Sequence, residues 1–388
     1  MSEDPYRVAV VGGSVGGLAA ALELRRNSNA EVAVYERSAG HMQARGAGVV
    51  MQPEVEYLLE QHGTKAEDVC VRLQERIRFT ADGRALRQRA PQLMTAWDAL
   101  YRALREPLGD VCYRQDSELV ALEQDDERVD LRFADGYQTS ADFLVAADGV
   151  NSQCRAILVG EASARYTGYV AWRGLENESD LPETIVRQLA DRFTFFHQAG
   201  MQLLCYLVPG ADGGTTPGER RVNWVWYINT PDQHLPAVLT GASGRSYRSF
   251  VPAGDVNRES EARVHELADR SLPPVFRDLV HASELFLQPV QDVAPQPRLH
   301  GRCALIGDAA GTVRPHTASG TSKAFADATL LAVALRDGSA AHRLPMEQLE
   351  WWQRQRQGDL VMTAEMGMRL AAGSGLGVEG APQPWVEE

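Results

Sequence analysis

The chain has 388 residues, of which 44% are hydrophobic and 23% are charged, and its formal net charge is −13. This composition is typical of a globular protein with a sizeable core, and the length suggests about two domains. The acidic balance argues against nucleic acid or an anionic membrane as a partner, and the longest apolar run, which Asp327 interrupts, is too short to span a bilayer.

The cysteine pattern indicates a reducing environment and no metal centre. The cysteines are spread along the chain without paired spacing and without a histidine cluster nearby. They are Cys70, Cys112, Cys154, Cys205 and Cys303. The N-terminus leads directly into a strand with no signal peptide, so we expect a cytoplasmic protein, and the sequence also allows a homodimer.

The first elements of the chain form a nucleotide-binding pattern. Residues 7–11 and 32–35 are predicted to be buried strands, residues 18–26 a helix, and the loop between them is Gly-Gly-Ser-Val-Gly-Gly. Glycines let this turn approach a pyrophosphate, the helix N-terminus attracts it, and an acid that closes the second strand can accept ribose hydroxyls. We expect the contacts to come from Gly12, Ser14, Val15, Gly17, Glu36 and Arg37. The alternative is a plain tight turn before a helix.

The middle of the chain changes character twice. Between residues 71 and 95 the pattern gives way to charged and turn residues, and a helix is predicted over 96–104. Strands follow up to residue 147. From about residue 166 to 290, aromatic-rich alternating runs separated by glycine and proline turns predict a mostly antiparallel sheet.

Two later segments carry further polar residues at the ends of predicted strands. Asp148 follows a buried strand, with Ser152 and Arg155 close behind it. Near the other end of the chain, Gly307 and Asp308 follow the apolar run Cys-Ala-Leu-Ile. Each of these two segments could be only a turn, but Asp308 is also placed to meet a ribityl hydroxyl or a phosphate.

Together the three segments resemble, in order and spacing over nearly the whole chain, the single-component FAD-dependent aromatic hydroxylases, the para-hydroxybenzoate hydroxylase family. The resemblance implies that the N-terminal loop and acid hold the ADP half of non-covalently bound FAD. It places Asp148 and Arg155 near both FAD and the incoming nicotinamide. It places Gly307 and Asp308 on the ribityl-phosphate side, and it matches Pro315 to the proline beside the isoalloxazine ring.

Two departures from the wider family favour a subgroup that hydroxylates dihydroxypyridines. Trp97 stands where many members carry an FAD-contacting arginine, and Ala-Ser-Gly ending at Gly320 replaces the common Gly-Gln-Gly. The segment 168–174, Gly-Tyr-Val-Ala-Trp-Arg-Gly, also carries this likeness. Arg45 could pair with the FAD diphosphate, although a solvated loop arginine is the alternative.

The resemblance implies a mixed α/β fold: a Rossmann-like FAD-binding domain, an inserted, mostly antiparallel β-sheet substrate domain, and C-terminal helices. We expect residues 1–70, 96–165 and 290–370 in the FAD-binding domain, 71–95 and 166–289 in the substrate domain, and 371–388 as a loosely ordered tail.

The implied reaction is NAD(P)H- and O2-dependent hydroxylation of a phenol-like or hydroxypyridine-type ring through a C4a-hydroperoxyflavin. The cofactor carries the difficult chemistry, and the protein positions the ring and excludes water. Alternatives are Baeyer–Villiger insertion, N-oxygenation or epoxidation with the same flavin chemistry, and a non-catalytic flavin-binding protein.

The aromatic sheet is expected to supply the substrate wall. Alternation places Trp224 and Trp226 on one face and Tyr227 on the other, although an ordinary sheet core explains the same pattern. The further candidates near a small aromatic substrate are His197, Tyr206 and, next to Pro315, His316. His316 and Pro315 are the catalytic candidates, but a lone histidine is more often structural.

Overall fold

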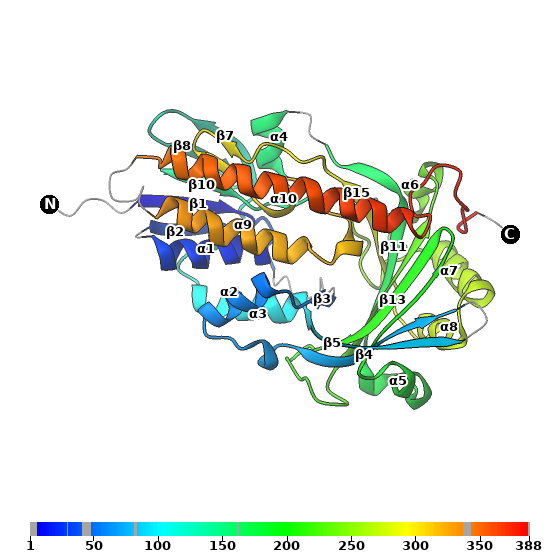
Figure 1. Ribbon diagram of the computed structural model, residues 1–388. Coiled ribbons are helices and arrows are strands. Elements are labelled where there is room, and N and C mark those ends of the chain that lie inside the picture. The colour runs from blue at the N-terminus through cyan, green and yellow to red at the C-terminus, as the bar shows by residue number, and fades with distance from the viewer. Residues whose placement is uncertain are drawn as a thin grey trace.

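The computed structural model describes residues 6–28, 30–40, 48–80, 84–160, 163–336 and 343–386. It has a mixed α/β fold in which a parallel sheet with its helices adjoins a large, mostly antiparallel sheet (Figure 1). The predicted fold class is therefore confirmed.

The parallel sheet has the strand order β16-β17-β10-β1-β2-β6. Its strands are β1 (Tyr6–Val11), β2 (Ala30–Tyr35), β6 (Tyr113–Arg114), β10 (Phe143–Ala146), β16 (Leu299–His300) and β17 (Cys303–Leu305). All neighbours pair in parallel except β16, which is antiparallel to β17. The central strands are apolar on both sides, as expected for parallel strands with both faces covered.

Helices cover one face of this sheet, and a smaller sheet and two helices cover the other. The first face carries α1 (Val15–Asn27), α2 (Pro53–Gln61), α3 (Trp97–Leu108) and α9 (Gly320–Leu335). The second carries β7 (Leu119–Gln124), β8 (Val129–Phe133), β9 (Gln138–Ala141), α4 (Gln153–Val159) and part of α10 (Met346–Ala372). Small residues along α1 let it pack closely against α9.

The large sheet has the order β15-β11-β14-β13-β12-β4-β5-β3. Its strands are β3 (Gly48–Val50), β4 (Val71–Phe79), β5 (Ala85–Ala96), β11 (Arg165–Asn177), β12 (Arg192–Gln198), β13 (Met201–Val208), β14 (Arg221–Asn229) and β15 (Phe286–Asp292). Its outer face packs against α5 (Glu183–Leu189), α7 (Arg258–Ser271) and α8 (Pro274–His281), and α6 (Leu235–Val238) adds to the same core. The boundaries that the sequence predicts between the FAD-binding domain and the substrate domain stay a prediction.

Short 3-10 helices complete the described chain. They are η2 (Ala66–Asp68), η3 (Glu178–Asp180), η4 (Asp232–His234), η5 (Gly307–Ala309) and η6 (Pro315–Thr317). Two of them, η5 and η6, fall on the segments that the sequence singled out.

Residues 71–95 are regular in the structure, although no strand was assigned to them from the sequence. Where the sequence shows charged and turn residues, the structure has the long antiparallel pair β4 and β5. Val71, Leu73 and Ile77 point into the core, whereas the intervening side chains are charged or polar and face outward. A half-exposed strand therefore produced a sequence that looked like a loop.

The C-terminal tail is also corrected, because residues 373–386 are docked and not loose. Trp385 is 7% exposed, and its ring stacks on Trp172 with a centroid distance of 5.4 Å. The side-chain amide of Asn229 donates to the carbonyl groups of Gly375 and Pro382, both at 2.9 Å. Buried aromatic area and satisfied backbone groups fix this segment.

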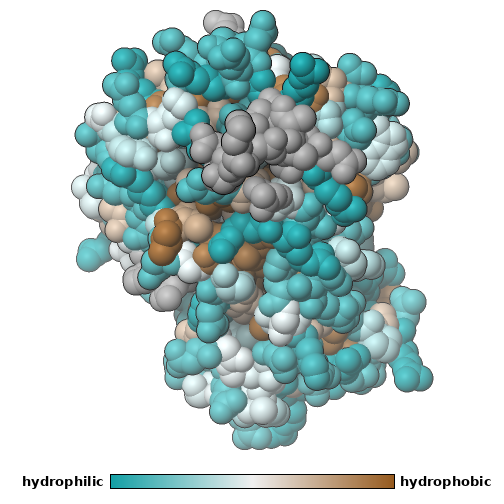
Figure 2. Space-filling view, turned by 90° about the vertical axis from the view of Figure 1, so that its left-hand side faces the viewer, coloured by the Kyte–Doolittle hydropathy of each residue, from teal (hydrophilic) through white to brown (hydrophobic). Residues whose placement is uncertain are grey.

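The described helices include none that is both long and apolar enough to cross a membrane. One face of the molecule is mostly hydrophilic, with hydrophobic residues gathered in small, separate patches (Figure 2). Within the described ranges, no group of three or more His, Cys, Asp and Glu is arranged to hold a metal ion.

Candidate active site

The three predicted cofactor segments meet at one edge of the parallel sheet. Gly12 follows β1, Asp148 lies just beyond β10, and Gly307 lies just beyond β17. Because these strands are parallel neighbours, their carboxyl ends lie side by side. A backbone hydrogen bond from Ala147 N–H to the Val11 carbonyl, 2.7 Å long, holds two of these ends together.

The glycine loop is pressed against the end of β10. Gly12 has a φ of +105°, and a Cβ there would lie 2.4 Å from the carbonyl oxygen of Ala147. A Cβ on Gly17 would lie 1.8 Å from the carbonyl oxygen of Gly12. Both positions therefore need glycine, because any side chain would push the turn away from the sheet edge.

The N-terminus of α1 opens beside this loop. Ser14 is the N-cap, its side chain accepts no hydrogen bond from the helix, and no acidic residue stands in the first turn of this described helix. The first-turn N–H groups starting at Val15 are thus left for an external acceptor. This donor set and the positive end of the helix dipole suit the pyrophosphate of a dinucleotide such as FAD.

Glu36 ties the second strand to the glycine loop. Its buried carboxylate accepts hydrogen bonds from Gly13 N–H at 2.8 Å and from Ser38 N–H at 2.9 Å. Tyr113, which the sequence interpretation missed, donates its hydroxyl to the Gly13 carbonyl at 3.0 Å. Arg37, next to Glu36, is exposed. A ribose hydroxyl at this place would share the Glu36 oxygens with the loop.

The Asp148 carboxylate holds its own turn. It accepts hydrogen bonds from the Ser152 hydroxyl at 2.5 Å and from Cys154 N–H at 3.0 Å. Ser152 in turn caps α4 by accepting from Arg155 N–H at 2.9 Å. The carboxylate and the cap together fix the direction in which the chain leaves β10.

Arg155 joins the second cofactor segment to the third. It is 2% exposed, and its guanidinium donates to the carbonyl of Ala309 at 3.1 Å and to the carbonyl of Val150 at 2.6 Å. These contacts are to backbone carbonyls, so in this structure Arg155 positions the two segments. Its predicted contact with the nicotinamide stays a prediction.

Asp308 keeps an accessible carboxylate at the sheet edge. Its side chain is 47% exposed, and its Oδ1 lies 3.0 Å from the Nζ of Lys323, which is 4% exposed. The same ammonium also donates to the Gly311 carbonyl. Gly307, just before it, has a φ of +57°. A ribityl hydroxyl could bond to Asp308 while Lys323 holds the carboxylate in place.

A buried charge triad supports this turn from behind. Asp327, fully buried on α9, accepts from Arg298 at 2.8 Å and from Arg356 at 2.7 Å. The Asp327 carboxylate also accepts from Gly307 N–H at 2.9 Å. Sequence reasoning noticed Asp327 only as a charge that breaks an apolar helix, and that signal could have pointed to a buried ion pair.

His316 lies where the cofactor edge meets the inner face of the large sheet. Its Nδ1 is 2.8 Å from the Gln202 amide oxygen, and its Nε2 is 3.1 Å from the Tyr169 hydroxyl. The consistent arrangement is a neutral ring that donates from Nδ1 and accepts at Nε2. The Tyr227 ring lies 4.7 Å from the imidazole, centroid to centroid. Burial, aided by the charge of Arg314, lowers the pKa of His316 to about 4.

This shift predicts a pH dependence of stability. Between pH 6.5 and about 4, the unfolded chain binds a proton at His316 that the folded protein does not bind, so stability falls as the pH falls. Going from pH 7.5 to 5 should cost the native protein about 2 kcal/mol more than it costs His316→Gln. Urea unfolding at the two pH values measures this difference, and parallel losses in the two proteins would contradict a neutral His316.

Tyr206 and His197 share the inner face with His316. Tyr206 stacks on Phe193 and donates its hydroxyl to the Gly48 carbonyl at 3.0 Å. His197 is exposed and pairs with Gln202 across the strands. Tyr206 therefore braces the segment that precedes α2, whereas His197 lies at the rim of the same face.

Trp224 and Trp226 lie on the opposite face of the large sheet. Both are 0% exposed and belong to the core beneath α7 and α8. The indole of Trp224 donates to the Ser283 hydroxyl at 2.9 Å. The alternation was interpreted correctly, but the structure does not bring these two residues together with His316. They are core residues, and the expectation that they line the substrate wall is corrected.

The chain is similar to known proteins in both sequence and fold. A family model described as FAD binding domain-like matches residues 166–292. The 2,6-dihydroxypyridine 3-monooxygenase of Paenarthrobacter nicotinovorans is 36% identical over 337 residues, covering 86% of this chain and 83% of that protein. The chain belongs to the FAD-dependent aromatic monooxygenases.

Other matches agree with this assignment. The 6-hydroxynicotinate 3-monooxygenase of Bordetella bronchiseptica is 27% identical over 376 residues, with 87% of this chain and 86% of that protein covered. The solved structure of 2,6-dihydroxypyridine-3-hydroxylase from Arthrobacter nicotinovorans has a TM-score of 0.90 at 31% identity and covers 100% of this chain and 99% of that one. The predictions of a flavin monooxygenase, of FAD and of NAD(P)H as the family's reductant are confirmed.

For three residues that the sequence predicts to contact the flavin, the described structure shows no interaction that tests the prediction. Arg45 lies outside the described residues. Pro315 begins η6 directly before His316 and is exposed. Gly320 begins α9 and is exposed, two residues after Ala318, which has a left-handed φ of 54°. Their roles stay predictions.

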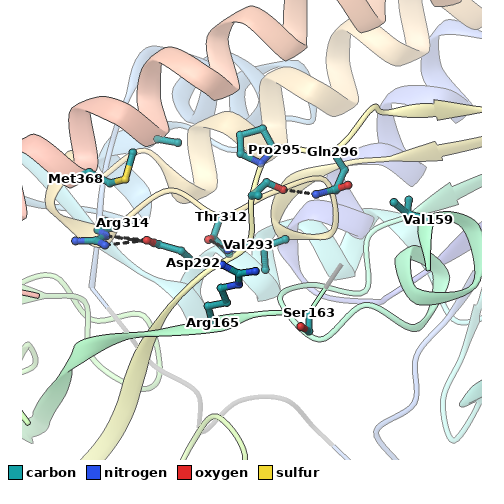
Figure 3. Close-up of a pocket in the computed structure, with 12 residues that line it drawn as sticks. Val159, Ser163, Arg165, Asp292, Val293, Pro295, Gln296, Thr312, Arg314 and Met368 are labelled. Carbon is teal, nitrogen blue, oxygen red and sulfur yellow. Dashed lines mark hydrogen bonds and ion pairs between the residues drawn. The ribbon is translucent and has the colours of Figure 1, made fainter. Parts of the chain in front are cut away.

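A separate pocket of about 600 Å³ lies between the start of β11, the end of β15 and α10 (Figure 3). Its wall includes the ion pair of Arg314 and Asp292, whose closest atoms are 2.8 Å apart. The Arg314 guanidinium also lies 5.7 Å from the Tyr169 ring centroid. None of the predicted flavin residues lines this pocket. Arg314 therefore separates it from the His316 cluster.

Proposed function

We propose that this monooxygenase hydroxylates a hydroxypyridine-type ring with NAD(P)H and O2. The observation that carries the proposal is the meeting of the cofactor edge with the inner sheet face at His316, which contacts Tyr169, Gln202 and Tyr227. Two relatives are named for activity on 2,6-dihydroxypyridine and on 6-hydroxynicotinate. These names support a hydroxypyridine-type ring as the substrate.

Different residues of the chain would bind the cofactor and the substrate ring. When bound, FAD supplies hydride uptake from NAD(P)H and activation of O2. Gly12, Glu36 and the free N–H groups of α1 would bind its nucleotide half, and Asp308 its ribityl side. The inner sheet face would then cover the substrate and keep water away from it.

His316 remains the catalytic candidate. Its ring is neutral at physiological pH, because burial lowers its pKa to about 4. Both ring nitrogens already have partners, so it would receive a substrate proton only by exchanging the Tyr169 hydroxyl for the substrate hydroxyl. Pro315 would fix the start of η6 and so the position of His316.

The test is a substrate screen with the FAD-loaded enzyme. Oxidation of NAD(P)H and uptake of O2 are followed with 2,6-dihydroxypyridine, 6-hydroxynicotinate, phenol and 4-hydroxybenzoate, and products are identified by NMR. We expect stimulated oxidation and a ring-hydroxylated product with at least one hydroxypyridine. Stimulation without a hydroxylated ring, or a product with an inserted ring oxygen or an N-oxide, would contradict the proposal.

A further inference from the structure

Arg173 lies on the inner face of the large sheet, in the middle of β11. It pairs with Val225 of β14, and two residues earlier Ala171 pairs with Tyr227. Because side chains alternate along strands, Arg173 shares its face with Tyr169 and Tyr227, both of which contact His316.

The titratable groups whose pKa reflects the charge of Arg173 are Tyr206 on β13 and Tyr227 on β14. The ion pair of Arg314 with Asp292 lies at the Tyr169 end of the same face. Burial raises the pKa of Tyr227 to about 12 and also raises that of Tyr206, while the charge of Arg173 lowers both. Both phenols are therefore protonated near neutral pH and do not supply a counter-charge.

The guanidinium of Arg173 has one side-chain partner in the described chain. Its Nη1 donates to the amide oxygen of Gln288 on β15 at 3.0 Å. Its Nε is buried and has no hydrogen-bond partner among the described residues. A half-buried guanidinium with one neutral acceptor is incompletely satisfied, and it carries a charge that no described carboxylate balances.

Other arginines of low exposure show what is missing. Those that are paired with a carboxylate are Arg220 with Glu178, Arg221 with Asp98, Arg298 and Arg356 with Asp327, and Arg314 with Asp292. Arg155 and Arg302 instead donate to at least two backbone carbonyls each. In the described ranges Arg173 has neither a carboxylate partner nor a pair of carbonyl acceptors. An unbalanced cation on the face that adjoins the cofactor edge is the condition expected of a residue that receives an anionic ligand.

We infer that Arg173 is a specificity-determining residue whose guanidinium binds the deprotonated hydroxyl of the substrate ring. This inference rests on the proposed function and adds the ionic form of the substrate: a hydroxypyridine anion, not the neutral ring. The ring hydroxyl loses its proton to water, and the resulting anion takes the place of the missing carboxylate beside Arg173. A ring oxygen that carries negative charge makes the ring carbons more electron-rich and so better targets for electrophilic oxygen.

The inference is tested by equilibrium titration, without turnover. Difference absorbance of 2,6-dihydroxypyridine or 6-hydroxynicotinate bound to the oxidised holoenzyme gives the pKa of the bound ring hydroxyl. We expect binding to lower this pKa relative to the free probe. Arg173→Gln should raise it by one unit or more, a tenfold change in the ratio of anion to neutral ring, and Arg173→Lys should restore part of the shift.

Two controls separate this role from a structural one. Arg165→Gln, at the exposed start of the same strand, should leave the bound pKa unchanged. Arg173→Gln should keep its FAD content and unfold at the same or higher urea concentration, because it removes an unbalanced charge. A bound pKa that is equal in the native protein and Arg173→Gln, or a native protein that binds neither probe, would overturn the inference. Binding with the expected shift but without hydroxylated product would instead contradict the proposed function alone.

Discussion

Replacing Asp308 with alanine should weaken FAD binding while the protein still folds. The Asp308 carboxylate is half exposed at the sheet edge, and its only described side-chain partner is Lys323 at 3.0 Å. Loss of charge-assisted hydrogen bonds to the cofactor should weaken FAD binding about 10- to 100-fold. The loss of the ion pair should cost about 1 to 3 kcal/mol, because it leaves the ammonium of Lys323, which is only 4% exposed, with the Gly311 carbonyl as its described acceptor. Flavin fluorescence titration and urea unfolding of the apoprotein measure the two effects.

A matched control is available on the smaller sheet. Asp135 pairs with Arg114 at 2.7 Å and its side chain is 35% exposed, similar to Asp308. Asp135→Ala should leave FAD affinity unchanged and cost less stability than Asp308→Ala, because Arg114 is 45% exposed and stays hydrated without its partner. If Asp308→Ala retained full flavin occupancy at native affinity, the placement of the ribityl side at this segment would be wrong.

The second large effect is expected at Asp327. Asp327→Asn leaves the buried guanidinium of Arg298 without a counter-charge and leaves Arg356 with only the exposed carboxylate of Asp359, so the free energy of unfolding should fall by about 3 to 5 kcal/mol. Such a loss is a large share of the stability of a typical domain. FAD affinity should fall as well, because the same carboxylate fixes Gly307 N–H. Urea unfolding and flavin titration follow the two losses.

Glu178→Gln is the control for that experiment. Glu178 and Arg220 form another buried ion pair, with closest atoms 2.6 Å apart and both side chains nearly inaccessible. It lies on η3, beside the large sheet and away from the cofactor edge. A comparable loss of stability with unchanged FAD affinity is expected. If Asp327→Asn weakened FAD binding no more than Glu178→Gln, the triad would only stabilise the fold.

Local signals explain what the sequence could predict. The loop at Gly12, the acid Glu36 and the Asp308 turn each follow a short apolar strand, and such strand-turn patterns are visible without tertiary structure. That the three segments meet followed from the family resemblance. Parallel neighbouring strands then explain physically why they do.

The supporting residues could not be predicted in this way. Arg298, Asp327 and Arg356 are far apart in the sequence, and nothing local shows that they share one buried carboxylate. The alternation in β14 identified two faces but not which of them the helices would cover. Which face is covered depends on α7 and α8, which follow later in the chain. Because these helices pack on the face that carries Trp226, this residue lies in the core and not in the substrate wall.

The strand order of the parallel sheet also has a consequence for biosynthesis. β17 completes the cofactor edge next to β10 and β1, yet it is made almost 300 residues after β1. A nascent chain that has reached only β10 holds the pyrophosphate loop but lacks Asp308 and the triad that braces it. High-affinity flavin capture should therefore be a late event, after synthesis of β17 and α9, and yellow colour should report that the two distant ends of the chain have been brought together.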